Sequence, residues 1–326
     1  MRLRPIYIVF MLCVLTLAAI NVAMVKWSHR LPREIKLSMI RTAQNPDTMA
    51  LGDSLMQNHL ISDILNSSAA PKGVSFRLVD SALGGTTPQD QAALAYYTLV
   101  FHPGIKTIVL SVKDMQLTKD QPTPPFKLNG NHEVEYDEHL PASFIGEVNG
   151  WDAWQRMEFE MVRRMPVMLG TQANVWKDVE LARRSMSAIG MPPVKSSSYG
   201  RVEDFQALEP VSEAAFDGDS QSFLTNPAHF QRAYEWVFQE AQRRGIKVVM
   251  VVIPVTEKHR NKFYSRPSWK PYLSAVSGLA EKKGIPVIDA NDWLPDTDFS
   301  DGVHMSKQGA AIFSSRLGEP LAGLVR

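Results

Sequence analysis

A serine near the start of the chain has neighbours that suit nucleophilic chemistry. Ser54 lies in the segment Gly52-Asp53-Ser54-Leu55, which directly follows an apolar run typical of a strand. A serine at the point where a strand turns into a helix exposes its hydroxyl, and its backbone amide can stabilise an oxyanion. Capping of the helix is the alternative role for Ser54.

A histidine near the end of the chain could act as the base that such a serine needs. Asp301-Gly302-Val303-His304 lies after the last apolar run and before the C-terminal helical pattern. Histidine can take the proton of a serine hydroxyl, and a carboxylate fixes the tautomer of the imidazole. The other seven histidines lack an aspartate three residues before them, so surface or capping roles are expected for them: His29, His59, His102, His132, His139, His229 and His259.

A third segment, Leu83-Gly84-Gly85-Thr86-Thr87, follows the second apolar run. Glycines at such a position let backbone amides approach a ligand closely, although a plain tight turn would have the same composition. All three segments follow predicted strands. Ligands of parallel sheets bind beyond the carboxyl ends of the strands, so the three segments could share one cleft.

Five apolar runs rich in Val and Ile predict buried strands, with helical patterns between them. The strands are expected at Thr48–Gly52, Val74–Val79, Ile105–Val112, Ile246–Ile253 and Ile285–Asp289. The helices are expected at Leu55–Leu65, Gln89–Val100, Pro227–Arg244, Trp269–Lys283 and Lys307–Leu317. This alternation predicts an α/β domain with a parallel sheet covered by helices on both faces. Because residues 115–226 contain no convincing strand, we expect them to form a largely helical insertion.

The N-terminus predicts a membrane anchor. Ile6–Val25 is a run of twenty residues without a charge, long enough as a helix to cross the hydrocarbon core of a bilayer. A cleavable signal peptide is the alternative, but its apolar region is usually shorter, and Asn21-Val22-Ala23 is a poor cleavage site. We therefore expect a transmembrane anchor at 1–26, a basic juxtamembrane stalk at 27–46 and the main domain at 47–326, with its insertion at about 115–226.

The orientation of this anchor is ambiguous in the sequence. Five basic residues follow the apolar run and only two precede it, which by the positive-inside rule places the large domain in the cytoplasm. The preceding residues are Arg2 and Arg4, and the following ones are Lys26, Arg30, Arg33, Lys36 and Arg41.

Composition excludes several other classes of function. The 326 residues include 35 Lys+Arg and 34 Asp+Glu, so no basic excess indicates a nucleic-acid partner. Cys13 is the sole cysteine, which rules out an intrachain disulfide and a cysteine-based zinc site. The segment His132–His139 lacks the second histidine of H-E-x-x-H and is expected to be a solvated acidic loop. With no P-loop and no G-x-G-x-x-G after a strand, we predict no metal and no cofactor.

The segments at 52–55 and 301–304 together resemble the SGNH or GDSL-type hydrolase superfamily, which has G-D-S-L near its start and D-x-x-H near its end. The resemblance covers roughly Asp47–Asp114 and Phe230–Leu321. It implies a flavodoxin-like three-layer sandwich with about five parallel strands. It also implies that Ser54 is the nucleophile, His304 the base and Asp301 its orienting acid. The amide of Gly85, or alternatively that of Gly84, would join the amide of Ser54 in an oxyanion hole.

The sequence departs from the family pattern after the third predicted strand. The family usually has G-x-N-D there, with the Asn side chain donating to the oxyanion, whereas this chain has Ser111-Val112-Lys113-Asp114. Lysine can donate to an anion, but its long stem places the charge differently from a short amide. Loss of one oxyanion donor costs about 10²–10³ in rate, so Lys113 is a doubtful replacement.

The anchor, the insertion and the altered third block are similar to membrane-anchored SGNH-type proteins of bacterial envelopes. That resemblance implies a single-pass protein of the cytoplasmic membrane with its catalytic domain outside. It also implies transfer or removal of acyl groups, often acetyl, on cell-surface polysaccharide, beside a multi-spanning acyltransferase partner. A tethered esterase or lipase and a non-catalytic carbohydrate-binding scaffold are the alternatives. Three tryptophans of the insertion could stack on sugars, although burial in the core is the expected role: Trp151, Trp154 and Trp176.

Overall fold

The computed structural model describes most of the main domain. The described residues are 32–114, 116–118, 139–163 and 229–325, with short stretches at 7, 11–12, 15–16, 19, 216–218, 220–221 and 223. In these parts of the chain no helix has both the length and the apolar character needed to cross a bilayer. Most of the expected anchor at 1–26 lies outside the described residues, so the anchor stays a prediction.

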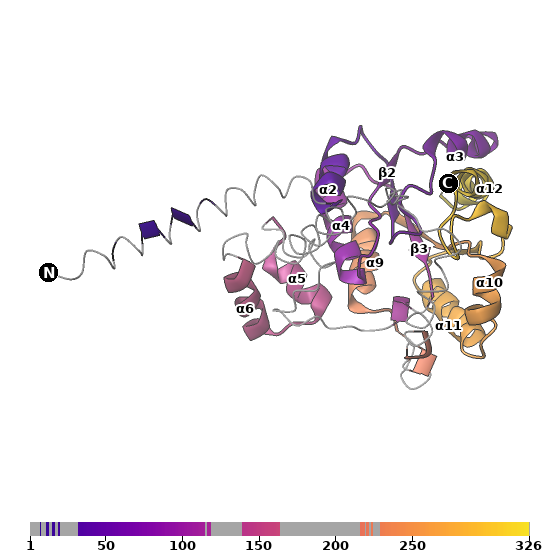
Figure 1. The fold of residues 1–326 in the computed structure, drawn as a ribbon. Coiled ribbons are helices and arrows are strands. Elements are labelled where there is room, and N and C mark those ends of the chain that lie inside the picture. Colours follow the sequence, from indigo (N-terminus) through magenta and orange to yellow (C-terminus); the bar gives the residue numbers. More distant parts are fainter. Residues whose placement is uncertain are drawn as a thin grey trace, which may run out of the picture.

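A five-stranded parallel sheet forms the centre of the domain, which confirms the predicted α/β class (Figure 1). Its strands are β1 (Thr48–Leu51), β2 (Leu78–Asp80), β3 (Thr107–Val112), β4 (Lys247–Val252) and β5 (Val287–Asp289). Their spatial order is β2-β1-β3-β4-β5, the flavodoxin-like order. In the register, Leu51 lies opposite Leu110, and Val112 lies opposite Val252. The carboxyl ends of these central strands therefore meet along one edge.

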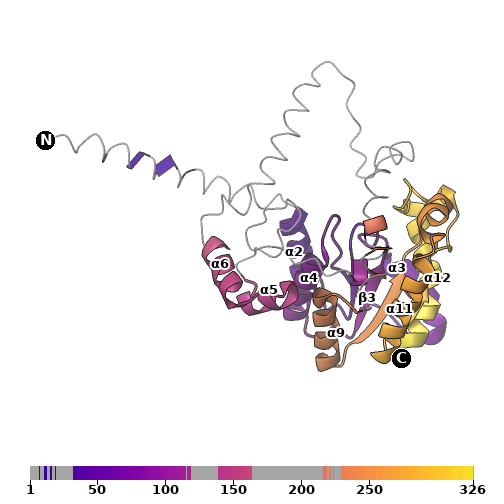
Figure 2. The same ribbon diagram turned by 90° about the horizontal axis from the view of Figure 1, so that it is seen from below.

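Helices cover both faces of the sheet, as Figures 1 and 2 show from two directions. Residues of α2 (Pro32–Thr42), α4 (Pro88–Phe101), α5 (Ala142–Asn149), α9 (Arg232–Arg244) and α11 (Trp269–Lys282) share one hydrophobic core with the sheet. Residues of α3 (Ser62–Ala69) and α12 (Lys307–Val325) share a second core. The strands alternate between them, because Ile108 and Leu110 belong to the first core and Val109 to the second.

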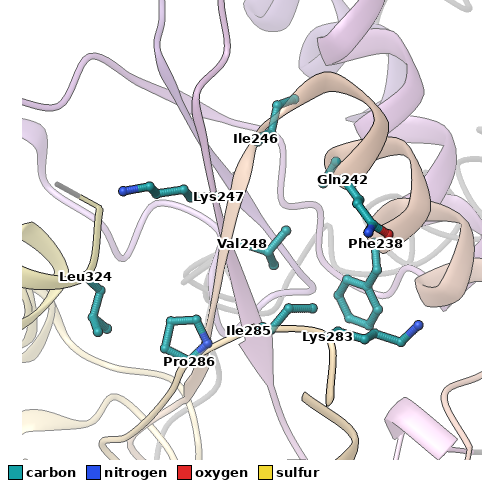
Figure 3. Close-up of a pocket in the computed structure, with 11 residues that line it drawn as sticks. Phe238, Gln242, Ile246, Lys247, Val248, Lys283, Ile285, Pro286 and Leu324 are labelled. Carbon is teal, nitrogen blue, oxygen red and sulfur yellow. The ribbon is translucent and has the colours of Figure 1, made fainter. Parts of the chain in front are cut away.

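A cavity of about 310 Å³ lies at the amino ends of β4 and β5 (Figure 3). Apolar side chains such as Phe238, Ile246 and Leu324 form much of its wall, and Lys247 and Lys283 are also part of it. Ser54 follows the carboxyl end of β1, so this cavity is at the opposite end of the parallel sheet from the predicted chemistry.

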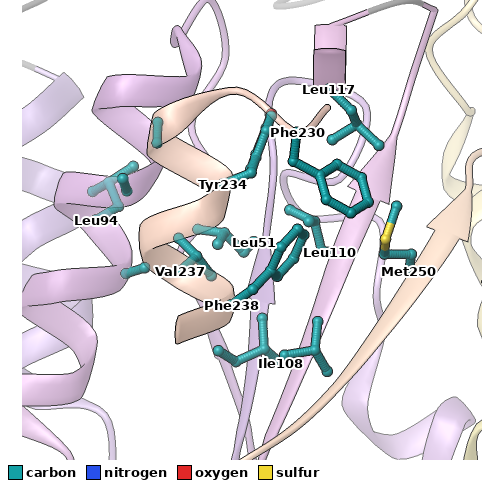
Figure 4. Close-up of a cluster of buried hydrophobic side chains, with 14 of the residues drawn as sticks. Leu51, Leu94, Ile108, Leu110, Leu117, Phe230, Tyr234, Val237, Phe238 and Met250 are labelled. Atoms are coloured by element: carbon teal, nitrogen blue, oxygen red, sulfur yellow. The ribbon is translucent and has the colours of Figure 1, made fainter. Parts of the chain in front are cut away.

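The larger core is packed between the sheet and helices α4 and α9 (Figure 4). Tyr234, Val237 and Phe238 of α9 are all buried, and the hydroxyl of Tyr234 donates to Gln91 on α4 at 2.9 Å. The two described helices of the predicted insertion, α5 and α6 (Ala153–Arg163), lie beyond α9. The ring of Phe144 on α5 lies 4.6 Å from Trp236 on α9. The described parts of residues 115–226 contain helices and no strand, and most of the expected insertion lies outside the described residues, so it stays a prediction.

Helix α2 belongs to this core although it lies within the predicted stalk. Its Leu37 and Ile40 are fully buried against the domain. The ammonium of Lys36, also buried, donates to Asp80 Oδ2 at 3.0 Å at the end of β2. The segment after residue 31 is therefore packed on the domain, while the proposed division at residue 46 remains a prediction.

The predicted helix Leu55–Leu65 is wrong in its first half. Residues 54–59 form turns, and α3 begins only at Ser62. Asn58 adopts a left-handed conformation with φ of 61°, which interrupts a right-handed helix. Its amide donates to Asp80 Oδ2 at 3.1 Å, so a tertiary partner replaces the helical one.

The predicted strand Val74–Val79 is also longer than β2. The amide and carbonyl of Phe76 are bonded to the side chain of Asn66 on α3, at 2.6 and 3.0 Å. These groups are therefore unavailable to the sheet, and pairing begins at Leu78.

We predict that Gly318→Ala lowers the free energy of unfolding by about 1–3 kcal/mol, the usual range for overpacking. A Cβ at Gly318 on α12 would collide with Ser68 Oγ and the carbonyl of Leu65 on α3. Gly323 lies on the same helix with nothing within 4 Å of its Cβ position, so Gly323→Ala is the matched control. The control is expected to be neutral or slightly stabilising. Urea denaturation measures both variants, and equal effects would contradict the close packing of α3 and α12.

Candidate active site

Ser54 lies in the first turn after β1, where the sheet leaves little room for the backbone. A Cβ at Gly52 would collide with Ser111 Oγ at the end of β3, so glycine is required for the two strand ends to approach. The carboxylate of Asp53 accepts the amide of Leu55 at 2.9 Å and holds the turn around Ser54. The serine is thus placed by a turn, not by the helix N-terminus that the sequence suggested.

His304 and Asp301 complete a hydrogen-bonded chain with this serine. His304 Nε2 lies 2.9 Å from Ser54 Oγ, and His304 Nδ1 lies 2.7 Å from Asp301 Oδ2. The other carboxylate oxygen of Asp301 accepts the amides of Val303 and His304 at 2.9 and 2.8 Å. Residues 250 positions apart are therefore brought together in the order hydroxyl, imidazole, carboxylate.

The electrostatics of Asp301 fix the direction of these bonds. Burial alone would raise the pKa of Asp301, but hydrogen bonds from the His304 side chain and from two backbone amides lower it below its ordinary value. An ionised Asp301 can only accept, so His304 donates through Nδ1–H. The imidazole Nε2 is then the acceptor that faces the hydroxyl of Ser54.

The two glycines of the second segment have different partners. The amide of Gly84 donates to Gln57 Oε1 at 2.8 Å, and a Cβ at Gly84 would lie 3.2 Å from Ser54 Cβ. Gly85 has a left-handed backbone with φ of 75°. Because the amide of Gly84 is bonded to Gln57, Gly85 remains the better candidate for an oxyanion donor.

Lys113 lies directly after β3. Its ammonium is 3.9 Å from Asp53 Oδ2, and its side chain is about one-fifth exposed. Burial would lower the pKa of Lys113, but the carboxylates of Asp53, Asp114 and Asp301 together raise it. The lysine is therefore a cation influenced by three carboxylates, of which Asp53 forms an ion pair with it.

A second polar cluster at this edge was not foreseen. Asp114, with a left-handed φ of 44°, lies 3.2 Å from His259 Nε2 and accepts the hydroxyl of Tyr264 at 3.3 Å. Burial raises the pKa of Asp114, but His259 and Lys113 lower it more, so it falls below its ordinary value. Burial, reinforced by the charge of Asp114, raises the pKa of Tyr264 well above 10. The Tyr264 ring stacks on Trp269, with centroids 3.7 Å apart.

Two histidines for which surface or capping roles were expected are instead buried near the site. His59 is 4% exposed and His259 is 5% exposed. For His59, burial is the main cause of a lowered pKa, and the nearby His304 adds to it. In the sequence, the one sign that His59 lies near the site is its position five residues after Ser54. This spacing brings the two residues together only because residues 54–59 form turns.

The tryptophans of the insertion differ in exposure. Trp151 is buried against Phe159 with centroids 5.0 Å apart, as expected for a core residue. Trp154 is 63% exposed and donates to Glu158 at 2.7 Å, so the expected burial is wrong for it. Trp176 and most of the acidic segment 132–139 lie outside the described residues. Among the residues that are described, no group of three His, Cys, Asp or Glu side chains could hold a metal ion.

Comparisons with known proteins do not assign this chain to a family. No family model matches it, and no curated protein matches it. Among solved structures, a putative acylhydrolase from Bacteroides fragilis is 10% identical to this chain, with a TM-score of 0.40. The match covers 89% of this chain and 95% of the acylhydrolase. A putative arylesterase from Agrobacterium tumefaciens is 13% identical, with coverages of 85% and 98% and a TM-score of 0.35. A carbohydrate acetylesterase from Sinorhizobium meliloti is 11% identical, with the same coverages and the same TM-score. These similarities are too low to carry an argument about function.

We predict that Lys113→Met lowers the free energy of unfolding by about 1 kcal/mol at pH 7, because buried carboxylates then lack their cation. Asp114 has a lowered pKa, so the stability it contributes is present at neutral pH and is lost as the pH falls below 3.8. The effect of Lys113→Met should therefore shrink at acidic pH. Urea denaturation of both proteins at pH 7 and at a pH below 3.8 measures this difference in the free energy of unfolding.

The control for this prediction is Lys72→Met. Lys72 pairs with Glu319 at 3.0 Å, but both side chains are exposed. Such surface pairs contribute little, so the control should change stability by less than about 0.5 kcal/mol. Equal losses for the two variants would show that Lys113 has no special electrostatic role.

Proposed function

We propose that this chain is a serine acyl-transfer enzyme that acts on acyl esters through a covalent acyl-enzyme. The single observation that carries the proposal is the chain from Ser54 Oγ to His304 Nε2 at 2.9 Å and from His304 Nδ1 to Asp301 Oδ2 at 2.7 Å. This arrangement of nucleophile, base and orienting carboxylate is the geometry from which serine acyl transfer is recognised on unrelated folds. A purely structural serine would have no need of an imidazole oriented by an ionised carboxylate.

In the first step, Ser54 Oγ attacks the ester carbonyl carbon while His304 Nε2 takes the hydroxyl proton. A bond forms between Oγ and the acyl carbon, and the carbonyl electron pair moves to its oxygen. When this tetrahedral intermediate collapses, the bond to the alcohol oxygen breaks, and His304 returns the proton to the leaving alcohol. Asp301 stays ionised and stabilises the imidazolium that exists between these events.

In the second step, a hydroxyl group attacks the acyl carbon of the acylated Ser54. His304 accepts the proton of that hydroxyl and then gives it to Ser54 Oγ as the serine is released. Water as the acceptor produces a free acid, whereas a sugar hydroxyl produces a new ester. In both steps the backbone amides of Ser54 and Gly85 are the proposed donors to the oxyanion.

Lys113 completes the proposed site in place of a neutral amide. Its charge is already balanced by three carboxylates, with Asp53 Oδ2 at 3.9 Å. A cation held in this way supports the negative charge that develops on the substrate oxygen, but its reach differs from that of asparagine. We assign Lys113 this electrostatic role, with Gly85 as the direct donor.

The proposed substrate is an acyl ester, most simply an acetyl ester, of cell-envelope polysaccharide. This part of the proposal draws on the twenty-residue apolar segment Ile6–Val25, which predicts a tether to the cytoplasmic membrane. An enzyme held at a membrane on the extracytoplasmic side would meet surface polysaccharide. A multi-spanning acyltransferase is the proposed partner that supplies the acyl group.

We predict that the full-length protein is labelled by a serine-directed fluorophosphonate and that Ser54→Ala abolishes the labelling. The probe phosphonylates an activated serine, so labelling reports a nucleophilic Oγ without requiring the natural substrate. Asp301→Asn should slow labelling by about 10³–10⁴, because the imidazole loses its tautomer and orientation. In-gel fluorescence over time measures these rates.

Ser111→Ala is the matched control for this experiment. Ser111 is buried at the end of the adjacent strand β3, and its Oγ lies against Gly52 near the same turn. It should retain the labelling rate of the unmodified protein. Labelling that persists in Ser54→Ala would exclude Ser54 as the nucleophile.

A second experiment separates transfer from hydrolysis. The full-length protein is placed in detergent or liposomes with p-nitrophenyl acetate and a neutral oligosaccharide. We predict that it forms acetylated oligosaccharide in addition to free acetate. Mass spectrometry of the oligosaccharide and an acetate assay measure the two products. Release of acetate with no acetylated sugar would instead support a tethered esterase.

A further inference from the structure

His59 lies between the segment that carries the candidate nucleophile and the segment that carries the candidate base. Its side chain is almost fully buried, with an exposure of 4%. Its Nδ1 is 2.7 Å from the carbonyl of Leu55, the residue after Ser54. The imidazole thus holds the main chain directly beyond Ser54.

The turn that carries His59 is fastened to the C-terminal helix. The carbonyl of His59 accepts the hydroxyl of Ser314 on α12 at 3.2 Å, and Ser314 Oγ accepts the amide of Ile61 at 2.9 Å. On its other side, the amide of Asn58 donates to Asp80 at 3.1 Å. The main chain around His59 is therefore held, and the ring projects from a fixed point.

The segment that carries His304 is equally well held. The amide of Ser300 donates to the carbonyl of His304 at 2.8 Å, and Phe299 pairs with Met305 as a short antiparallel bridge. Ser306 donates its amide to the carbonyl of Asp298 at 2.8 Å. Residues 304–306 therefore form one unit, and α12, to which the turn of His59 is bonded, continues directly from it.

We propose that His59 is a positioning residue that sets the separation of Ser54 Oγ and His304 Nε2. Its ring holds the carbonyl of Leu55, and its own main chain is bonded to α12, the helix that follows His304. This inference rests on the proposed function, because it assigns His59 a part in serine activation. A displacement of about 1 Å between reacting groups can lower the rate by a factor on the order of 10². Loss of the His59 contact is therefore expected to affect the reaction rate more than the stability of the fold.

The protonation state of His59 agrees with this role. Burial and the adjacent His304 lower its pKa, while the Leu55 carbonyl, Asp80 and the Met305 backbone oppose the shift without reversing it. His304 and Asp80 are the charged or titratable side chains that affect the ring. A neutral imidazole at this place donates to Leu55 and adds no positive charge beside the imidazolium that His304 becomes during acyl transfer.

The test is the rate constant and the final amplitude of fluorophosphonate labelling in His59→Leu and His59→Asn, using the full-length protein. Leucine fills the space without any donor, whereas the Asn amide can occupy the position of Nδ1–H and donate to Leu55. We expect His59→Leu to slow labelling by about 10–100-fold while every molecule is eventually labelled. His59→Asn should stay within about fivefold of the unmodified rate.

His102→Leu is the matched control. His102 also bonds a main-chain carbonyl through its ring, that of Ile40, with Nε2 at 2.5 Å. It follows α4 near the opposite end of the sheet, before β3 begins. Its removal should leave the labelling rate unchanged even if it lowers stability.

Three results would overturn the role of His59. These are an unchanged rate constant in His59→Leu, a loss of amplitude alone with no change in rate, and equal slowing by Leu and Asn. If His59→Leu does not fold, His59→Gln decides, because its amide cannot reproduce the Nδ1 donor position: slower labelling supports the proposal, and the unmodified rate contradicts it. Fluorophosphonate labelling of Ser54→Ala, or the absence of labelling in the unmodified protein, would instead contradict the proposed function itself.

Discussion

The contact between Ser54 and His304 depends on the parallel pairing of the central strands. Parallel strands end at the same edge of a sheet, so the turn after β1 and the loop that follows β5 reach one place although they are 250 residues apart. Glycine at position 52 permits the close approach of β1 and β3, since any side chain there would strike Ser111. The geometry of the candidate site is thus a consequence of sheet register first and of individual side chains second.

Charge is the second constraint at this edge. Asp53, Asp114 and Asp301 all contribute to raising the pKa of Lys113, so a single cation serves three carboxylates. Burying several like charges is costly unless opposite charge lies nearby. This gives a physical reason for a lysine directly after β3. In this chain Lys113 places positive charge among the carboxylates near the serine.

Elements outside the sheet also hold the turn that carries the serine. Lys36 of α2 and the amide of Asn58 share one carboxylate oxygen, Asp80 Oδ2, at 3.0 and 3.1 Å. Ser314 of α12 bonds the same turn from the other side of the sheet. The first helix after the predicted anchor and the last helix of the chain therefore both act on residues 54–61. A site made from turns is kept rigid by these bonds, where a regular helix would have been rigid by itself.

The sequence by itself determined the α/β class, the approximate places of all five strands and the residue types that could form a hydroxyl, imidazole and carboxylate chain. These follow from local patterns, namely runs of Val and Ile and the short motifs around Ser54 and His304. Tertiary structure alone decided that residues 54–59 form turns, that Asp80 is their partner, and that His59 and His259 are buried beside the site. The reason is that these features depend on hydrogen bonds between residues far apart in the chain, and a local pattern carries no information about such partners.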